Sequence, residues 1–274
     1  MSDPGDPLAR IATALEQLSP RAAAAPDWAA APAYIWDGKA RAVGQILAPP
    51  LDLLRGIEAQ KTIVTANIAR LAAGHAAHDM LLWGARGMGK SVLLRASVAA
   101  AQEHPGARLA LVQVAPDALA TLSALLGTLA AEDRRFLIFI DDLGFEEVDS
   151  GGPRALRSWL EGGVEARPGN VRLAVTSNRR AIVPRHISEQ DDPINPRDAV
   201  DDRLALADRF GLSVGFHACS QDDYLAIITG YCAAQGLAWD QGEALEWSKR
   251  RGARSGRVAW QFVTELAGRA GKPL

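Results

Sequence analysis

Short apolar runs alternate with segments of helical periodicity along the middle of the chain. The apolar runs are Met80–Trp83, Leu109–Val114, Phe136–Ile140, Val171–Thr176 and Leu212–Phe216. The helical segments before and between them are Asp52–Gly74, Val92–Ala96, Leu119–Ala131 and Ala155–Glu165. Apolar runs of this length predict strands that are buried on both faces. Because strands alternate with helices, we expect an α/β fold in which helices cover both faces of a parallel sheet.

The two ends of the chain have a different pattern. From Gln221 onward no strand pattern recurs, and three helices are expected at Asp222–Gln235, Glu243–Arg251 and Ser255–Arg269. Near the start, the amphipathic segment Leu8–Leu18 is followed by the Pro- and Ala-rich stretch Ser19–Pro32. We therefore expect three parts, which are a helical prefix with linkers over residues 1–50, an α/β domain over residues 51–218 and a small all-α domain over residues 219–274.

Composition and charge narrow the class of protein. The chain has 274 residues, of which 48% are hydrophobic, so a sizeable globular core is expected. Its net charge of -2 supplies no overall attraction to nucleic acid or anionic lipid, and a nucleic-acid role would need a local basic patch. Cys219 and Cys232 form no CxxC motif. Because neither a signal-peptide pattern nor a membrane-length apolar stretch occurs, we expect a cytoplasmic protein without membrane contact.

A phosphate-binding motif follows the first apolar run. The fixed positions of the pattern GxxxxGKS are filled by the segment Gly84, Ala85, Arg86, Gly87, Met88, Gly89, Lys90 and Ser91. Its glycines allow backbone N–H groups to converge on phosphate oxygens at the start of a helix. Lys90 is then expected to bind the β- and γ-phosphates of ATP, and Ser91 to ligate Mg²⁺. A chance glycine turn is the alternative, but the strand before and the helix after favour the nucleotide site.

Two acidic residues end the third predicted strand. We expect Asp141 to hold Mg²⁺ through water, and Asp142 to orient or deprotonate the attacking water. A solvated acidic turn is the alternative, since further acidic residues follow closely. Asp142 is shorter than the Glu that most related ATPases have at this position, so Glu146 is the alternative base.

Three more polar residues stand where predicted elements begin or end. Asn178 follows the fourth strand and is expected to sense the γ-phosphate, unless it only caps a turn. Arg257 lies in the first turn of a helix capped by Ser255, where a cation opposes the helix dipole and suggests a bound phosphate. Arg209 precedes the fifth strand and could reach a neighbouring subunit's γ-phosphate, although its spacing alone favours a surface ion pair with Asp201, Asp202 or Asp208.

In their order and spacing these motifs resemble those of AAA+ ATPases. More narrowly, the chain resembles the bacterial ATP-binding proteins of the domain of unknown function 815 family. The matching strings lie at residues 81–87, 141–143, 160–168, 176–180, 208–212 and 254–257, within a resemblance that covers about residues 51–268. The resemblance implies an AAA+ core followed by a helical lid, with paired aspartates as the normal pattern at 141 and 142. Met88 departs from the usual Thr at a position that is expected to contribute mainly its backbone.

These features predict an ATPase that couples ATP binding and hydrolysis to rearrangement of a protein or DNA partner. A homo-oligomer is expected, with Arg209 donated in trans. The alternative is an ATP-gated module that loads or recruits DNA or a protein with little turnover, through the basic residues 249–257 and the polar stretch 181–201. A small-molecule kinase is a third possibility, which the absence of a substrate-binding insertion within the α/β segment disfavours.

Overall fold

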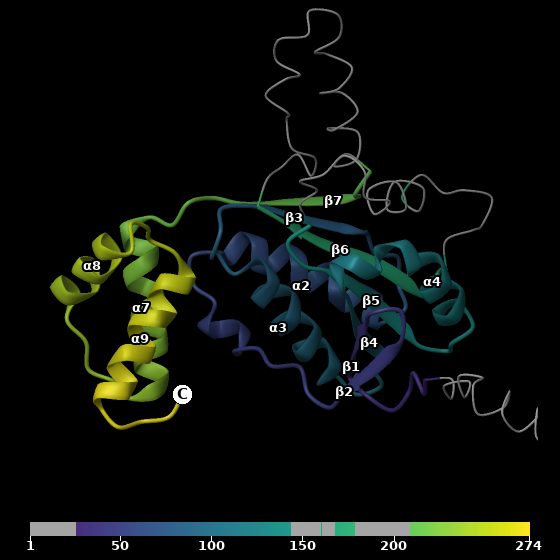
Figure 1. Cartoon of the computed structure of the whole chain (residues 1–274), viewed down its shortest axis with the longest axis horizontal. Helices are drawn as coiled ribbons and strands as arrows, with labels where there is room; N and C mark the ends of the chain where they lie inside the picture. Colours follow the sequence, from purple (N-terminus) through teal and green to yellow (C-terminus); the bar gives the residue numbers. More distant parts are fainter. Residues whose placement is uncertain (1–25, 144–159, 161–167, 179–208) are drawn as a thin grey trace, which may run out of the picture.

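Seven strands form one sheet in the part of the chain that the structure describes. The structure is a computed structural model, and it describes residues 26–143, 160, 168–178 and 209–274. The strands are β1 (Ala33–Trp36), β2 (Ala40–Val43), β3 (Met80–Gly84), β4 (Leu109–Val114), β5 (Arg135–Ile140), β6 (Val171–Ser177) and β7 (Leu212–Phe216). They are ordered β2-β1-β4-β5-β6-β3-β7 across the sheet (Figure 1).

The strands other than β2 run parallel to one another. Strand β3 lies between β6 and β7, with Met80 opposite Ala174 on one side and Leu212 on the other. Strand β5 lies between β4 and β6. Because the strands are parallel, the carboxyl ends of β3, β5 and β6 lie at the same edge of the sheet. The predicted site residues that follow these strands meet there.

Helices cover both faces of the sheet, as the apolar runs predict. Alternate residues of one strand face opposite sides: Met80 and Leu82 lie in one buried cluster and Leu81 in the other. The first cluster also contains apolar residues of α2 (Glu58–Ala72) and α3 (Lys90–Gln102). The second contains residues of α4 (Leu122–Ala130). The three-layer α/β/α architecture is therefore confirmed.

A unit of three helices follows β7 and lies at one end of the molecule, at the left in Figure 1. It consists of α7 (Gln221–Gln235), α8 (Gln241–Arg250) and α9 (Gly256–Arg269). Ser220 forms a capping box with Asp223 at the start of α7, and the predicted N-cap Ser255 accepts a hydrogen bond of 3.2 Å from the Val258 N–H. Buried residues of all three helices join the cluster that contains α2 and α3, so this lid packs on the α/β core.

Most predicted elements agree with the structure to within a few residues, with shifts at helix starts. The expected helix Asp52–Gly74 is divided into the short 3₁₀ helix η1 (Leu51–Leu53) and α2. The expected helix Leu119–Ala131 begins as the 3₁₀ helix η2 (Pro116–Thr121), which leads into α4. The expected helix at 155–165 lies outside the described residues apart from Leu160. None of the described helices has the length and apolar character needed to cross a membrane.

The prediction that residues 1–50 form a helical prefix with linkers is wrong for residues 33–43, which form two strands of the sheet. Strand β1 pairs in parallel with β4, and β2 pairs antiparallel with β1. The Tyr34 side chain is 1% exposed and donates a hydrogen bond of 2.7 Å to the Asp27 carbonyl. Burial of this aromatic residue on a sheet face explains why a four-residue segment forms a strand despite its alanine-rich surroundings. The expected amphipathic segment Leu8–Leu18 lies outside the described residues.

Candidate functional site

The loop between β3 and α3 has a backbone path that requires glycine. Gly84 has φ of 120°, and a Cβ there would lie 2.1 Å from the Phe216 carbonyl oxygen. The adjacent Ala85 N–H donates a hydrogen bond of 2.9 Å to that same oxygen, which fixes the loop to the end of β7. Gly89, with φ of 84°, precedes the first residue of α3. The loop therefore delivers a helix N-terminus to the carboxyl edge of the sheet.

The Lys90 side chain connects this loop to β6. Its Nζ donates hydrogen bonds to the carbonyl oxygens of Gly84 and Ala85, each at 2.9 Å, and to Asn178 Oδ1 at 3.2 Å. The residue is 7% exposed. Burial lowers the pKa of the Lys90 ammonium from its usual value, whereas the nearby carboxylates of Asp142 and Asp141 act in the opposite direction.

Ser91 and Asp141 present oxygen atoms side by side. The Ser91 hydroxyl donates to Asp141 Oδ1 at 2.5 Å. Hydroxyl and carboxylate oxygens are the ligands that Mg²⁺ prefers, and Mg²⁺ commonly uses one or two protein ligands together with nucleotide phosphates. Among the residues that the structure describes, no group of three His, Cys, Asp or Glu side chains is placed to hold a metal by itself. The donor set thus fits Mg²⁺ that is bound together with a phosphate.

Asp142 and Asn178 are in direct contact. The Asn178 amide Nδ2 donates to Asp142 Oδ1, while its Oδ1 accepts the bond from Lys90. Asn178 therefore lies between the cation and the second carboxylate, at the tip of β6. Asp142 has φ of 50°, and it is the one non-glycine residue with positive φ in the described part of the chain. The alternative base Glu146 lies outside the described residues.

The start of α9 touches the loop, a contact that the sequence analysis missed. The Arg257 N–H donates a hydrogen bond of 3.1 Å to the Gly87 carbonyl. A Cβ on Gly87 would lie 2.9 Å from Ser255 Oγ, and one on Gly256 would lie 3.1 Å from the Gly87 oxygen. Charge repulsion from Arg257 and Arg86 contributes to the lowered pKa of Lys90. Arg86 and Arg257 are thus close enough to Lys90 for their charges to affect it.

Met88 has a role that the sequence analysis did not anticipate. Its backbone was expected to be its main contribution, but the side chain is 6% exposed and lies in the core cluster with α2, α3 and the lid. An apolar side chain at this position therefore adds to the packing beneath the loop. A threonine there would leave part of this apolar contact unfilled.

Arg209 lies at the other end of the strands. It precedes β7, whose first residue Leu212 is opposite Met80 at the start of β3, whereas the loop follows the end of β3. Arg209 borders a pocket of about 310 Å³ together with His78, Asp79 and Arg172. With a rise of about 3.3 Å per strand residue, the length of β3 separates Arg209 from the loop of its own chain. The structure brings together the other predicted site residues, but not this one.

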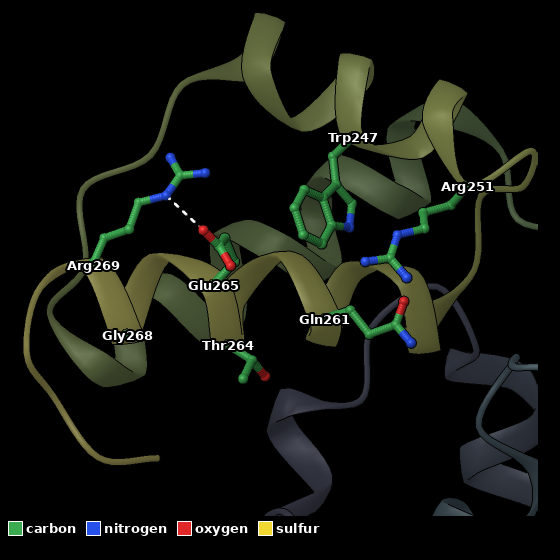
Figure 2. A pocket seen from close by; sticks show the side chains of 7 residues that line it. All are labelled: Trp247, Arg251, Gln261, Thr264, Glu265, Gly268 and Arg269. Atoms are coloured by element: carbon green, nitrogen blue, oxygen red, sulfur yellow. Dashed lines mark hydrogen bonds and ion pairs between the residues drawn. The ribbon is translucent and has the colours of Figure 1, made fainter.

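Two cations of the predicted basic segment 249–257 contact side chains within the lid. A pocket of about 530 Å³ lies between α8 and α9. Trp247, Arg251 and Glu265 are among the side chains that line it (Figure 2). The Arg251 guanidinium lies 4.8 Å from the centre of a Trp247 ring, and Arg250 forms an ion pair of 3.3 Å with Glu246. Two of these cations therefore have partners on α8 itself.

The fold is that of AAA+ ATPases, as comparison with solved structures shows. RuvB of Thermotoga maritima, a Holliday junction branch migration motor, is similar with a TM-score of 0.55 and 16% identity, over 83% of this chain and 68% of that one. The ORC2 protein of Aeropyrum pernix is similar with a TM-score of 0.53 and 18% identity, over 82% of this chain and 66% of that one. At such identities the likeness establishes the fold alone. No curated protein matches the sequence.

The family comparison is more specific. A family model with the description "Protein of unknown function (DUF815)" matches residues 29–270, which covers the sheet, the loop and the lid. The resemblance expected from the sequence motifs is confirmed, and the chain belongs to the DUF815 family.

Proposed function

We propose that this chain binds MgATP where the loop 84–91, the ends of β5 and β6 and the start of α9 meet, and that it hydrolyses the bond to the γ-phosphate. One observation carries the proposal. Hydrogen bonds join Lys90 to Asn178 and Asn178 to Asp142, while Ser91 is bonded to Asp141. A phosphate-binding lysine, a metal-binding pair and a carboxylate base are thereby gathered at one edge of the sheet.

The electrostatics of the site favour an anion. Arg257 and Arg86 each repel the Lys90 ammonium, as their contribution to its lowered pKa indicates. A triphosphate would relieve that repulsion and would also accept hydrogen bonds from the loop N–H groups at the start of α3. Bound phosphate would raise the Lys90 pKa toward its usual value, because it adds negative charge beside a half-desolvated ammonium.

Each residue of the site has a separate role in the proposed reaction. Lys90 binds the β- and γ-phosphates, and Ser91 and Asp141 hold Mg²⁺, which neutralises charge on the phosphate oxygens when it is bound. Asp142 accepts the proton of a water whose oxygen attacks the γ-phosphorus, while the bond to the bridging oxygen of ADP breaks. Asn178 orients that water, and Arg257 contacts the γ-phosphate from the lid. ADP and inorganic phosphate are the products.

Analysis of the products of labelled ATP tests this function. The full chain, incubated with Mg²⁺ and ATP labelled in the γ-phosphate, is expected to release labelled inorganic phosphate, which thin-layer separation detects. Transfer of the label to an acceptor would instead identify a kinase. Nucleotide binding with almost no phosphate release would favour the gated loader over the remodelling ATPase. Absence of binding to both ATP and ADP would refute the proposal.

We propose further that copies of the chain assemble so that Arg209 of one subunit reaches the nucleotide of its neighbour, and that turnover rearranges a protein or DNA partner. The support is geometric, since Arg209 lies at the opposite end of the strands from its own loop. An arginine supplied to the γ-phosphate in this way stabilises the developing charge of the transition state.

Mixing two inactive variants tests the trans arrangement. Arg209→Ala is expected to lower turnover about a thousandfold, as loss of comparable arginines does. When Arg209→Ala subunits are mixed with Asp142→Asn subunits, some sites combine an intact arginine from one chain with an intact base from the other. Phosphate release should then exceed that of either variant alone. Mixed assemblies that are verified by differential tags but stay inactive would exclude the trans role.

A further inference from the structure

Thr176 contacts three consecutive residues at the end of β5. Its hydroxyl donates a hydrogen bond of 2.6 Å to Asp141 Oδ1 and accepts one of 2.8 Å from the Asp142 N–H. Its carbonyl accepts a third bond, also 2.8 Å, from the Leu143 N–H. Thr176 is 1% exposed. One buried side chain therefore connects the carboxylate of the first acidic residue to the backbone of the second.

The position of Thr176 follows from the sheet. The parallel pairing of β5 with β6 continues as far as Ile140 opposite Val175. Beyond this point Asp142, with φ of 50°, turns the chain out of the strand. A non-glycine residue adopts this conformation only where its surroundings stabilise it. The Thr176 hydroxyl and carbonyl receive the N–H groups of Asp142 and Leu143 at that turn, so they hold the strained residue in place.

We propose that Thr176 is a positioning residue for both carboxylates of the site, an inference that rests on the proposed function. Asp141 Oδ1 accepts bonds from two hydroxyls, Ser91 and Thr176. Ser91 also has to offer a lone pair to Mg²⁺, whereas the Thr176 hydroxyl is engaged by Asp141 and the Asp142 N–H and is not needed by the metal. Thr176 thus fixes the orientation of the Asp141 side chain even when the Ser91 hydroxyl turns toward the metal. Through its bond to the Asp142 N–H, it also fixes the backbone position from which the Asp142 carboxylate reaches the attacking water.

A hydroxyl is the group that this position requires. It must donate to Asp141 and accept from Asp142 at the same time, which Thr and Ser can do and Val cannot. Thr176→Val preserves the shape but leaves the Asp142 N–H without its partner and removes one donor from Asp141. Partners of metal ligands commonly contribute about ten- to a hundredfold to metal affinity or activity.

The test measures metal binding and turnover separately in the full chain. Binding of Mn²⁺ to the ADP complex is measured by electron paramagnetic resonance, and ADP affinity is measured in EDTA. Thr176→Val is expected to weaken Mn²⁺ binding about ten- to a hundredfold and to lower the kcat of phosphate release by a similar factor, while ADP affinity in EDTA stays within about twofold. Thr176→Ser should restore both quantities.

A control at a hydroxyl that also makes two hydrogen bonds tests whether the loss of such bonds anywhere in the fold has the same effect. Thr121 also makes two hydrogen bonds, accepting from Trp36 Nε1 at 2.8 Å and donating to the Ala118 carbonyl at 2.7 Å, but its Trp36 partner lies on β1, three strands from β6. Thr121→Val should leave Mn²⁺ binding and kcat unchanged. If Thr176→Val is too unstable to assay, the test uses the Thr176→Ser variant alone, because the proposal requires this variant to retain metal binding and turnover.

Three results would overturn the inference. The first is normal metal binding and turnover in Thr176→Val, and the second is a Thr176→Ser variant as defective as the valine variant. The third is an equal loss of ADP affinity in EDTA, which would mean that the loop as a whole is disturbed. In each of these cases the wild-type chain still binds and hydrolyses ATP. If the wild-type chain bound no nucleotide, the proposed function would fail, and this inference with it.

Discussion

Lys90→Ala should lower affinity for ATP at least about a hundredfold and remove measurable phosphate release. The substitution deletes the ammonium that is proposed to bind two phosphates, and charge-assisted hydrogen bonds of this kind contribute about 1.5–3 kcal/mol each. The Nζ is bonded to the carbonyl oxygens of Gly84 and Ala85 and to Asn178. Isothermal titration with ATP and Mg²⁺ measures the affinity, and release of labelled phosphate measures the turnover.

Lys61 offers a matched control for this variant. Lys61 lies on α2 and not in the loop, but its Nζ also donates to two backbone carbonyl oxygens, those of Leu51 at 3.1 Å and Leu54 at 2.9 Å. Lys61→Ala therefore removes a comparable set of backbone contacts and should keep wild-type affinity. Equal affinity in Lys90→Ala and wild type would contradict the assignment of the loop as the ATP site.

Asp142→Asn should retain ATP binding but lower the rate of phosphate release by about a hundredfold to ten thousandfold, the range that a general base commonly contributes. An amide has the shape of the carboxylate but accepts no proton from water. The fold should tolerate the change, because asparagine adopts a φ near 50° more readily than most residues. Single-turnover measurement of phosphate release, with ATP affinity measured in parallel, gives the two quantities.

An aspartate far from the site serves as the control for this change. Asp133 pairs with Arg108 on the surface, and its side chain is 93% exposed. Asp133→Asn should leave both ATP affinity and the rate unchanged. A normal rate in Asp142→Asn would assign the base to another group, of which Glu146 is the first to test.

The strands, and the edge of the sheet where the site residues meet, could be predicted because the patterns that indicate them involve residues close together in sequence. Apolar runs such as Phe136–Ile140 are too short for helices and too apolar for surface loops. The motif at 84–91 combines glycines, a lysine and a serine whose spacing has a direct chemical reason. Once the strands are taken as parallel, the residues that follow β3, β5 and β6 must meet at one edge, and this brings Lys90, Asp141 and Asn178 together.

The features that sequence reasoning missed depend on contacts between distant segments. Strands β1 and β2 are only four residues each, and they follow a Pro- and Ala-rich stretch that is typical of a linker. Thr176 resembles any β-branched residue in a strand until Asp141 is placed beside it. The contact between Gly87 and Arg257 joins residues that are far apart in sequence. A polar residue at the end of an otherwise apolar strand was the one available signal for Thr176.

The contact of Gly87 with the first turn of α9 couples the phosphate-binding loop directly to the lid. The Arg257 N–H donates a hydrogen bond to the Gly87 oxygen, and with glycine at both 87 and 256 the two backbones approach closely. Such a bond contributes about 1 kcal/mol, which corresponds to a population ratio of roughly five, whereas the apolar residues that the lid shares with α2 and α3 hold it on the core. Under the proposed function, a change in the loop on phosphate binding is therefore transmitted to the first turn of α9, while the buried apolar contacts keep the three-helix unit on the sheet.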